Sequence, residues 1–244
     1  MPRMITELEQ RNGPRNLWEP IRPPRWREMP AGTTLRFGRD SAIEIGTDPV
    51  DRKVSGRAVE LCHDGERWHI TATNRHGVDL YRWGQAARPL TVGVSEPVVW
   101  PRIALYVRGD EAAYQHWILC DDPTMPTLPP DRTTTDTERT PQSSLTARQL
   151  EAVYEVFEDL LAWPPRYPSR PRSPKEAAGP LGVKEDGVRR LLESARAKAA
   201  KLGPIGNSLD DPTYIHTLVS HGCILPQISD VDSRIRPPST LGAE

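Results

Sequence analysis

The chain has 244 residues, enough for one large or two small domains, but only 36% of them are hydrophobic and 26 are proline. This composition disfavours a single continuous core and favours two modest cores joined by proline-rich segments. The net charge of −1 excludes nucleic-acid binding driven by the charge of the whole chain, so any such site must be a local basic patch.

Sequence signals for secretion, membrane insertion, metal binding and catalysis are absent. The N-terminus has no apolar signal-peptide core, and no run approaches the roughly 18 apolar residues of a membrane span. The three cysteines form no CxxC pair, so we expect reduced thiols in a cytoplasmic protein, without zinc. His63 and His69 flank one turn and are expected on the surface. Because no nucleotide-binding or catalytic motif occurs, we expect a binding protein without a cofactor, not an enzyme.

The N-terminal half is predicted to contain an irregular arm followed by strands. Residues 1–30 are polar and rich in proline, which predicts an arm with little structure of its own. From residue 31 to 120, short runs of β-branched and aromatic residues are separated by turn residues. The best hairpin covers residues 58–73, where Asp64-Gly65 supplies the positive φ of a tight turn. Strands at such short spacing predict an all-β antiparallel sandwich.

Three loops of this sandwich carry residues suited to phosphate. Gly38-Arg39 comes first, a Ser55-Gly56-Arg57 stretch follows, and Asn74 lies three residues before Gly77. In order and spacing these motifs resemble the forkhead-associated (FHA) family, whose hallmarks are Gly-Arg, a Ser-Arg-x-x-His-like stretch and Asn-Gly. The resemblance implies an FHA-like antiparallel sandwich that binds phosphothreonine peptides.

The resemblance also implies roles for single residues. Arg39 would supply a planar fork for phosphate oxygens, and Ser55 a hydroxyl donor. Arg57 would add a second positive charge. Asn74 or His76 would hold the peptide backbone. Counted from the following glycine, His76 occupies the family's Asn position, whereas Asn74 has the matching residue type, and the sequence leaves this choice open.

Three positions depart from the family pattern. Gly56 stands where the family often has arginine, Ala58 where it usually has a structural histidine, and His76 in place of the Asn of Asn-Gly. These changes leave an alternative, in which a degenerate FHA fold serves only as a protein-docking surface.

Residues 121–144 form a predicted linker rich in proline and threonine, with almost no large apolar residue. Thr133 has Asp136 three residues later, and other threonines also lie near acidic residues. We therefore formulate the hypothesis that a Ser/Thr protein kinase phosphorylates the linker, which then folds back onto Arg39 and Ser55.

The C-terminal part, residues 145–228, is predicted to be a small all-α domain. Apolar residues recur at three- and four-residue spacing, with Thr146 as the N-cap of the first helix. Helices are expected at 145–161, 174–181, 185–202 and 212–221. Pro180 is expected to end the second helix early, because proline in a helix interior typically costs about 3 kcal/mol. Residues 229–244 are expected to form a disordered tail.

The second and third of these helices resemble the helix-turn-helix of bacterial regulators. A short helix with small residues precedes a Gly182-Val183 turn, and a longer helix follows. Residues early in that helix would meet bases or phosphates in the major groove. The predicted DNA contacts are Lys184, Arg189, Arg190 and Arg172. Residues 164–203 carry ten basic and four acidic side chains, about +6, although these charges also fit an ordinary solvated helix face.

Together the two resemblances predict a cytoplasmic bacterial regulator that couples Ser/Thr phosphorylation to DNA binding and transcription. Its partners would be a phosphothreonine protein, or its own linker, and DNA, with no membrane. One alternative is an adaptor that binds proteins at both ends and never binds DNA. The other is a DNA-binding protein whose sandwich no longer binds phosphate.

Overall fold

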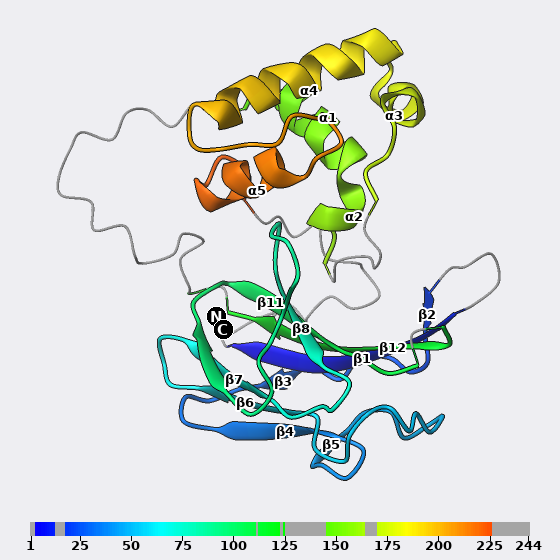
Figure 1. The fold of residues 1–244 in the computed structure, drawn as a ribbon, viewed down its shortest axis with the longest axis vertical. Coiled ribbons are helices and arrows are strands. Elements are labelled where there is room, and N and C mark those ends of the chain that lie inside the picture. Colours follow the sequence, from blue (N-terminus) through cyan, green and yellow to red (C-terminus); the bar gives the residue numbers. More distant parts are fainter. Residues whose placement is uncertain are drawn as a thin grey trace, which may run out of the picture. The chain divides into compact units, whose positions relative to one another are not determined.

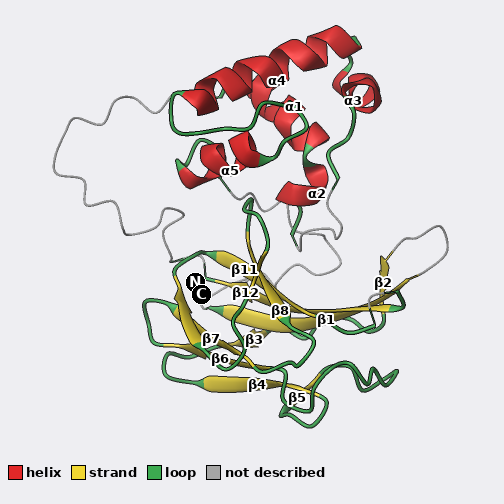
Figure 2. Ribbon diagram, viewed as in Figure 1, coloured by secondary structure: helices red, strands yellow, loops and turns green. Residues whose placement is uncertain are grey.

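A computed structural model describes residues 3–12, 18–110, 112–122, 124, 145–163 and 170–225. These residues form two compact units, a β-sheet unit and a helical unit (Figures 1 and 2). Nearly all of the predicted linker and the whole predicted tail lie outside the described residues. None of the helices in the described ranges is both long and apolar enough to cross a membrane.

The first unit contains two mostly antiparallel sheets, which confirms the general layout predicted from the strand pattern. One sheet has the order β2-β1-β12-β11-β8-β9, with β3 also pairing β1, and the other the order β10-β7-β6-β4-β5. The strands are β1 (Met4–Asn12), β2 (Trp18–Pro20), β3 (Arg27–Glu28), β4 (Thr34–Gly38), β5 (Ile43–Glu44), β6 (Val59–His63), β7 (Trp68–Ala72), β8 (Val78–Arg82), β9 (Arg88–Pro89), β10 (Ser95–Val98), β11 (Arg102–Val107) and β12 (Tyr114–Asp121). Only β4 and β5 pair in parallel among these strands.

The predicted hairpin is present as β6 and β7. Asp64 Oδ1 accepts hydrogen bonds from the backbone N–H of Glu66 and Arg67, and Gly65 has a φ of 113°. His69 lies at the surface and pairs with Asp64 at 2.7 Å. Local turn chemistry thus suffices to define this element.

The expected surface position of His63 is wrong. The alternation of β6 places His63 on the same buried face as Val59 and Leu61, and its side chain is fully buried. Its ring packs edge-on against Trp68, with centroids 4.6 Å apart. Its Nδ1 accepts a hydrogen bond from Gly65 N–H, so the imidazole holds the hairpin turn from inside.

The predicted irregular arm is also wrong. β1 pairs with β12 over eight residue pairs, and the Ile5 side chain is fully buried. The sequence did not indicate this strand, because two of its buried residues are glutamates. Glu7 forms an ion pair with Arg27, and Glu9 forms one with Arg22. A residue pattern alone does not reveal a strand whose buried charges are neutralised by partners further along the chain.

The second unit contains the expected helices. They are α1 (Ala147–Val156), α2 (Glu158–Leu161), α3 (Pro174–Leu181), α4 (Glu185–Ala200) and α5 (Thr213–Ser220). Thr146 and Ser173 each form a capping box with the residue three positions on. The predicted first helix is divided at Phe157, whose backbone leaves the helical region while its buried ring packs against Tyr214.

The second helix has the expected bounds 174–181, although Pro180 was expected to shorten it. α3 continues through Pro180 to Leu181, and Gly182 then ends it with a φ of 64°. Pro180 lies in the last turn, where its missing N–H removes one hydrogen bond from the helix. The left-handed conformation of Gly182 is a common helix terminus, and the chain turns there into α4.

Four residues from the turn after β8, Trp83–Ala86, belong to the helical unit. Buried Trp83 donates from Nε1 to the Leu161 carbonyl at 2.9 Å, and His216 Nδ1 donates to the Gly84 carbonyl at 2.7 Å. A Cβ on Gly84 would lie 2.7 Å from a methyl group of Val219. The core of the helical unit thus includes a segment that the sequence assigned to the sandwich.

Candidate functional site

Three loops leave the same end of the second sheet. β4 pairs antiparallel with β6, and β6 with β7, so Phe37, Val59 and Ala72 lie side by side at that end. The loops that follow β4, precede β6 and follow β7 therefore begin as neighbours. They carry Arg39, Ser55 and Asn74, respectively.

Backbone hydrogen bonds join the first two loops. Arg39 N–H donates to the Ser55 carbonyl at 3.1 Å, and Asp40 N–H to the Gly56 carbonyl at 2.9 Å. The Arg39 side chain donates from Nε to the Val54 carbonyl at 2.6 Å. This bond orients the guanidinium beside the Ser55 segment. Arg39 and Ser55, which the family resemblance assigns to one site, therefore lie on loops that are joined by hydrogen bonds.

Two glycines allow this close approach. Gly38 has a φ of 152°, and a Cβ there would lie 2.4 Å from the Gly56 carbonyl oxygen. A Cβ on Gly56 would lie 2.2 Å from Asp40 Oδ2. The carboxylate of Asp40 thus occupies the space that a side chain at position 56 would need. Sequence reasoning missed Asp40, although it directly follows the Gly-Arg pair.

Asn74 is a buried residue that fastens loops together. Its Oδ1 accepts the Ser55 N–H at 2.9 Å, and its Nδ2 donates to the carbonyls of Gly77 at 3.0 Å and Arg108 at 2.8 Å. The side chain is 0% exposed. Because the Asn74 amide is buried and already bonded to three backbone groups, the geometry does not favour its predicted contact with a peptide. His76 is exposed, so it is the member of the pair that faces solvent.

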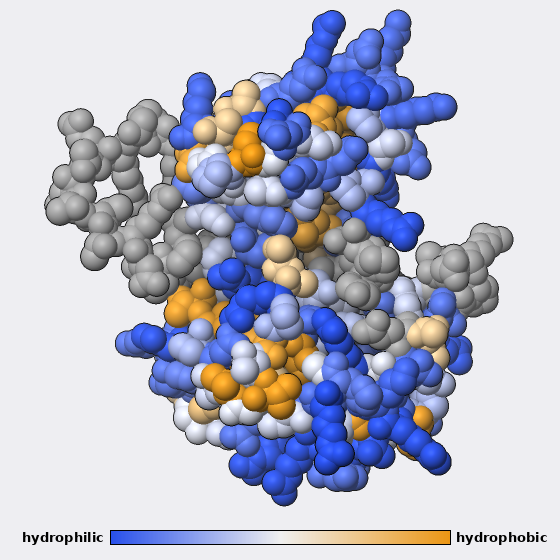
Figure 3. Space-filling model, in the orientation of Figure 1, coloured by the Kyte–Doolittle hydropathy of each residue, from blue (hydrophilic) through white to orange (hydrophobic). Residues whose placement is uncertain are grey.

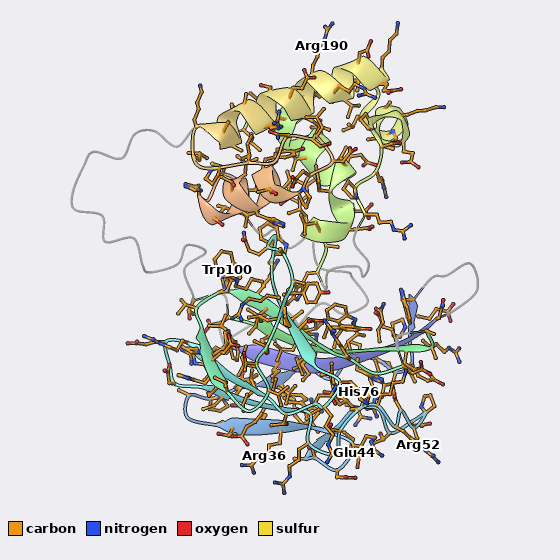
Figure 4. The ribbon with its side chains drawn as sticks, in the orientation of Figure 1. Arg36, Glu44, Arg52, His76, Trp100 and Arg190 are labelled. Atoms are coloured by element: carbon orange, nitrogen blue, oxygen red, sulfur yellow. The ribbon has the colours of Figure 1, made fainter. Side chains whose placement is uncertain are left out.

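The solvent side of the loops carries a hydroxyl and several cations. Ser55 Oγ accepts the Arg75 N–H at 3.1 Å, which leaves the hydroxyl hydrogen to donate to a ligand. The side chains of Arg57, Arg75 and His76 are exposed. Arg75 was not predicted, and its place beside His76 was the only signal for it. In Figure 4, the labelled residues His76 and Arg52 lie toward the same end of the sandwich.

The basic residues of the helical unit differ in their partners. The Arg172 side chain is engaged by Glu155 and Glu158 of the first two helices, so the geometry does not favour its predicted DNA contact. Arg189 pairs with Glu185 within α4 at 2.8 Å. Lys184, at the N-cap of α4, and Arg190 are exposed.

α4 has one buried face and one exposed face. α4 packs against α1, α3 and α5, through buried Val188, Leu192 and Ala195. Arg190 points away from these helices (Figure 4), and long hydrophilic side chains project above α4 in Figure 3. Glu185 and Asp186 occupy its first turn, where the helix dipole stabilises carboxylates.

The described residues contain no group of three or more metal-binding side chains arranged for a cation. A scan of the chain against protein-family models gave no match, and a search of curated proteins gave no significant match.

Proposed function

We propose that the β-sandwich unit is an FHA-type module that binds a phosphothreonine segment at the three loops. The observation that supports it best is the hydrogen-bonded convergence of Arg39 and Ser55. In the same proposal the helical unit binds DNA through α4. The protein then couples the activity of a Ser/Thr kinase to transcription.

The chemistry of the loops suits a phosphate dianion. The guanidinium of Arg39 offers planar donors, and the hydroxyl of Ser55 offers one more. Exposed Arg57 and Arg75 add positive charge on the neighbouring loops. The exposed carboxylate of Asp40 carries a negative charge next to Arg39, which reduces the attraction of the loops for a phosphate.

Arg39→Ala is expected to weaken binding of phosphothreonine peptides at least about tenfold, because a charge-assisted hydrogen bond contributes about 1.5–3 kcal/mol. Calorimetric titration of the full chain with a phosphothreonine peptide library measures this. Arg36→Ala is the matched control, because Arg36 lies on β4, three residues before Arg39, is exposed and pairs with Glu60. Equal affinity of Arg39→Ala and wild type, or equal binding of unphosphorylated peptides, would contradict the proposed site.

Arg190→Ala is expected to weaken DNA binding and to lower the salt dependence by about one phosphate contact. Fluorescence titration with genomic DNA fragments at low and moderate salt measures both quantities. Arg148→Ala is the control, because Arg148 is an exposed arginine on α1 that pairs with Glu151. The same loss in both variants would show only a general charge effect and would argue against α4 as the DNA-binding helix.

The second candidate function is an adaptor that binds proteins at both ends. Arg172 and Arg189 favour it, because these two of the four predicted DNA-binding residues already form ion pairs with glutamates of the same unit. Absence of DNA binding even at low salt would support the adaptor. Thr133 of the linker hypothesis lies outside the described residues, and phosphate mapping by mass spectrometry in the native host tests it.

A further inference from the structure

A buried network of charged side chains lies at the base of the loop between β5 and β6. His116 of β12 stands between two carboxylates, with Nδ1 2.9 Å from Glu9 Oε1 and Nε2 3.0 Å from Asp51 Oδ2. All three side chains are 1% exposed. Burying charges is costly unless each is paired and hydrogen-bonded, so such a network requires well-defined geometry.

The same carboxylates hold the backbone of the loop. Glu9 Oε1 also accepts the Gly46 N–H at 2.5 Å, at the start of the loop. Asp51 Oδ1 accepts the Lys53 N–H at 2.9 Å, and Asp51 Oδ2 accepts the Asp110 N–H at 2.7 Å. The loop then reaches Val54 and Ser55 within a few residues. The network therefore connects two strands to the segment that carries Ser55.

Both carboxylates are ionised at neutral pH. Burial raises the pKa of Glu9, but hydrogen bonds from His116 and Gly46, with the nearby charges of His116 and Arg22, hold it below its ordinary value. Burial likewise raises the pKa of Asp51, but hydrogen bonds from Asp110, Lys53 and His116 lower it overall. Each ring nitrogen of His116 lies against a carboxylate oxygen, so both nitrogens are placed to donate a hydrogen bond.

Close packing fixes the network on its other side. A Cβ on Gly109 would lie 2.2 Å from Asp51 Oδ2 and 2.9 Å from His116 Cδ2. The backbone before β12 therefore lies directly against the two side chains. Little space remains for His116 or Asp51 to take another position.

We propose that the Glu9–His116–Asp51 network is a clamp that positions the 45–58 loop, which makes the N-terminal strand β1 a positioning element for the loop site. The link from loop order to ligand binding rests on the proposed function, whereas the clamp itself does not. Glu9 reaches the loop directly through Gly46 and indirectly through His116 and Asp51.

Glu9→Gln tests the clamp by removing one charge while keeping the shape of the side chain. Hydrogen exchange of the full chain should quicken about five- to tenfold at the amides of Gly46, Lys53 and Val54, because charge-assisted hydrogen bonds are about twice as strong as neutral ones. Glu7→Gln is the matched control. Glu7 is a buried glutamate on the same strand that pairs with Arg27, and its replacement should leave these loop amides unchanged.

Asp51→Asn provides a second test within the loop, where it cannot disturb the pairing of β1 with β12. It should increase exchange at the same amides. In the wild type, nitrogen chemical shifts of the His116 ring at pH 7 should show both nitrogens protonated. A neutral tautomer of His116, unchanged loop exchange in both variants, or equal increases over the whole sheet would overturn the proposal.

Peptide titration separates this inference from the proposed function. If wild type binds phosphothreonine peptides, Glu9→Gln should weaken that binding and Glu7→Gln should not. If wild type binds none, the proposed function fails, while the exchange and ring-nitrogen measurements still decide the clamp. If the clamp variants loosen the loop without weakening peptide binding, its role in positioning the binding site is refuted.

Discussion

Gly38→Ala is expected to destabilise the β-sandwich unit by at least about 3 kcal/mol and to abolish the proposed peptide binding at the loops. A Cβ at this position would lie 2.4 Å from the Gly56 carbonyl oxygen and 2.8 Å from the Ala58 backbone nitrogen. Both neighbours are backbone atoms of the loop that carries Ser55, so relief requires that segment to move away from Arg39. Hydrogen exchange of β6 and β7 amides in the full chain measures the loss of stability.

Gly32→Ala is the matched control for this substitution. Gly32 also has a positive φ, of 77°, but a Cβ there meets nothing within 4 Å. Its replacement should therefore cost only the strain of the left-handed conformation, about 1–2 kcal/mol. Equal destabilisation by the two variants would mean that backbone conformation, and not close approach of the loops, explains the glycine at position 38.

Local signals account for the elements that the sequence predicted well. The Asp64-Gly65 turn defines the β6–β7 hairpin, and the capping boxes of Thr146 and Ser173 define where α1 and α3 begin. Each of these signals is complete within a few consecutive residues. A sequence pattern can detect such signals because no distant partner is required.

Distant pairing explains what the sequence did not predict. β1 is a strand because β12 pairs with it, and because Glu9 forms an ion pair with Arg22 and a hydrogen bond with His116. Trp83 was expected in the sandwich, but its indole bonds to Leu161 in the helical unit. The paired residues of β1 and β12 are more than a hundred positions apart, and Trp83 and Leu161 are 78 positions apart, so no local window contains both partners.

The sequence indicated which loops come together at the candidate site, but it did not indicate all of the site's residues or the role of each one. The order of motifs brought Arg39 and Ser55 together, as the hydrogen bonds between their segments require. Sequence alone left Asn74 and His76 as equal candidates for one role. Burial separates them, because the Asn74 amide is enclosed by three loop segments and His76 lies in solvent.

Asn74→Ala is expected to destabilise the β-sandwich unit by about 3 kcal/mol or more, since each buried polar group that loses its partner costs about 1–3 kcal/mol. The substitution removes the acceptor of the Ser55 N–H and the donor to two carbonyls, those of Gly77 and Arg108. Ser55 then loses its fixed position next to Arg39, so peptide affinity should fall together with stability. Urea unfolding and peptide titration of the full chain measure the two effects.

Thr73→Ala is the control that separates burial from hydrogen bonding in this loop. Thr73 precedes Asn74 and donates from its hydroxyl to the Arg57 carbonyl at 2.9 Å, but its side chain is exposed. Water can replace that bond, so its loss should cost less than about 1 kcal/mol.

Asn74→Asp should resemble Asn74→Ala, because a carboxylate would face two carbonyl oxygens that need donors. Equal and small effects of all three substitutions would show that Asn74 does not hold the loops together.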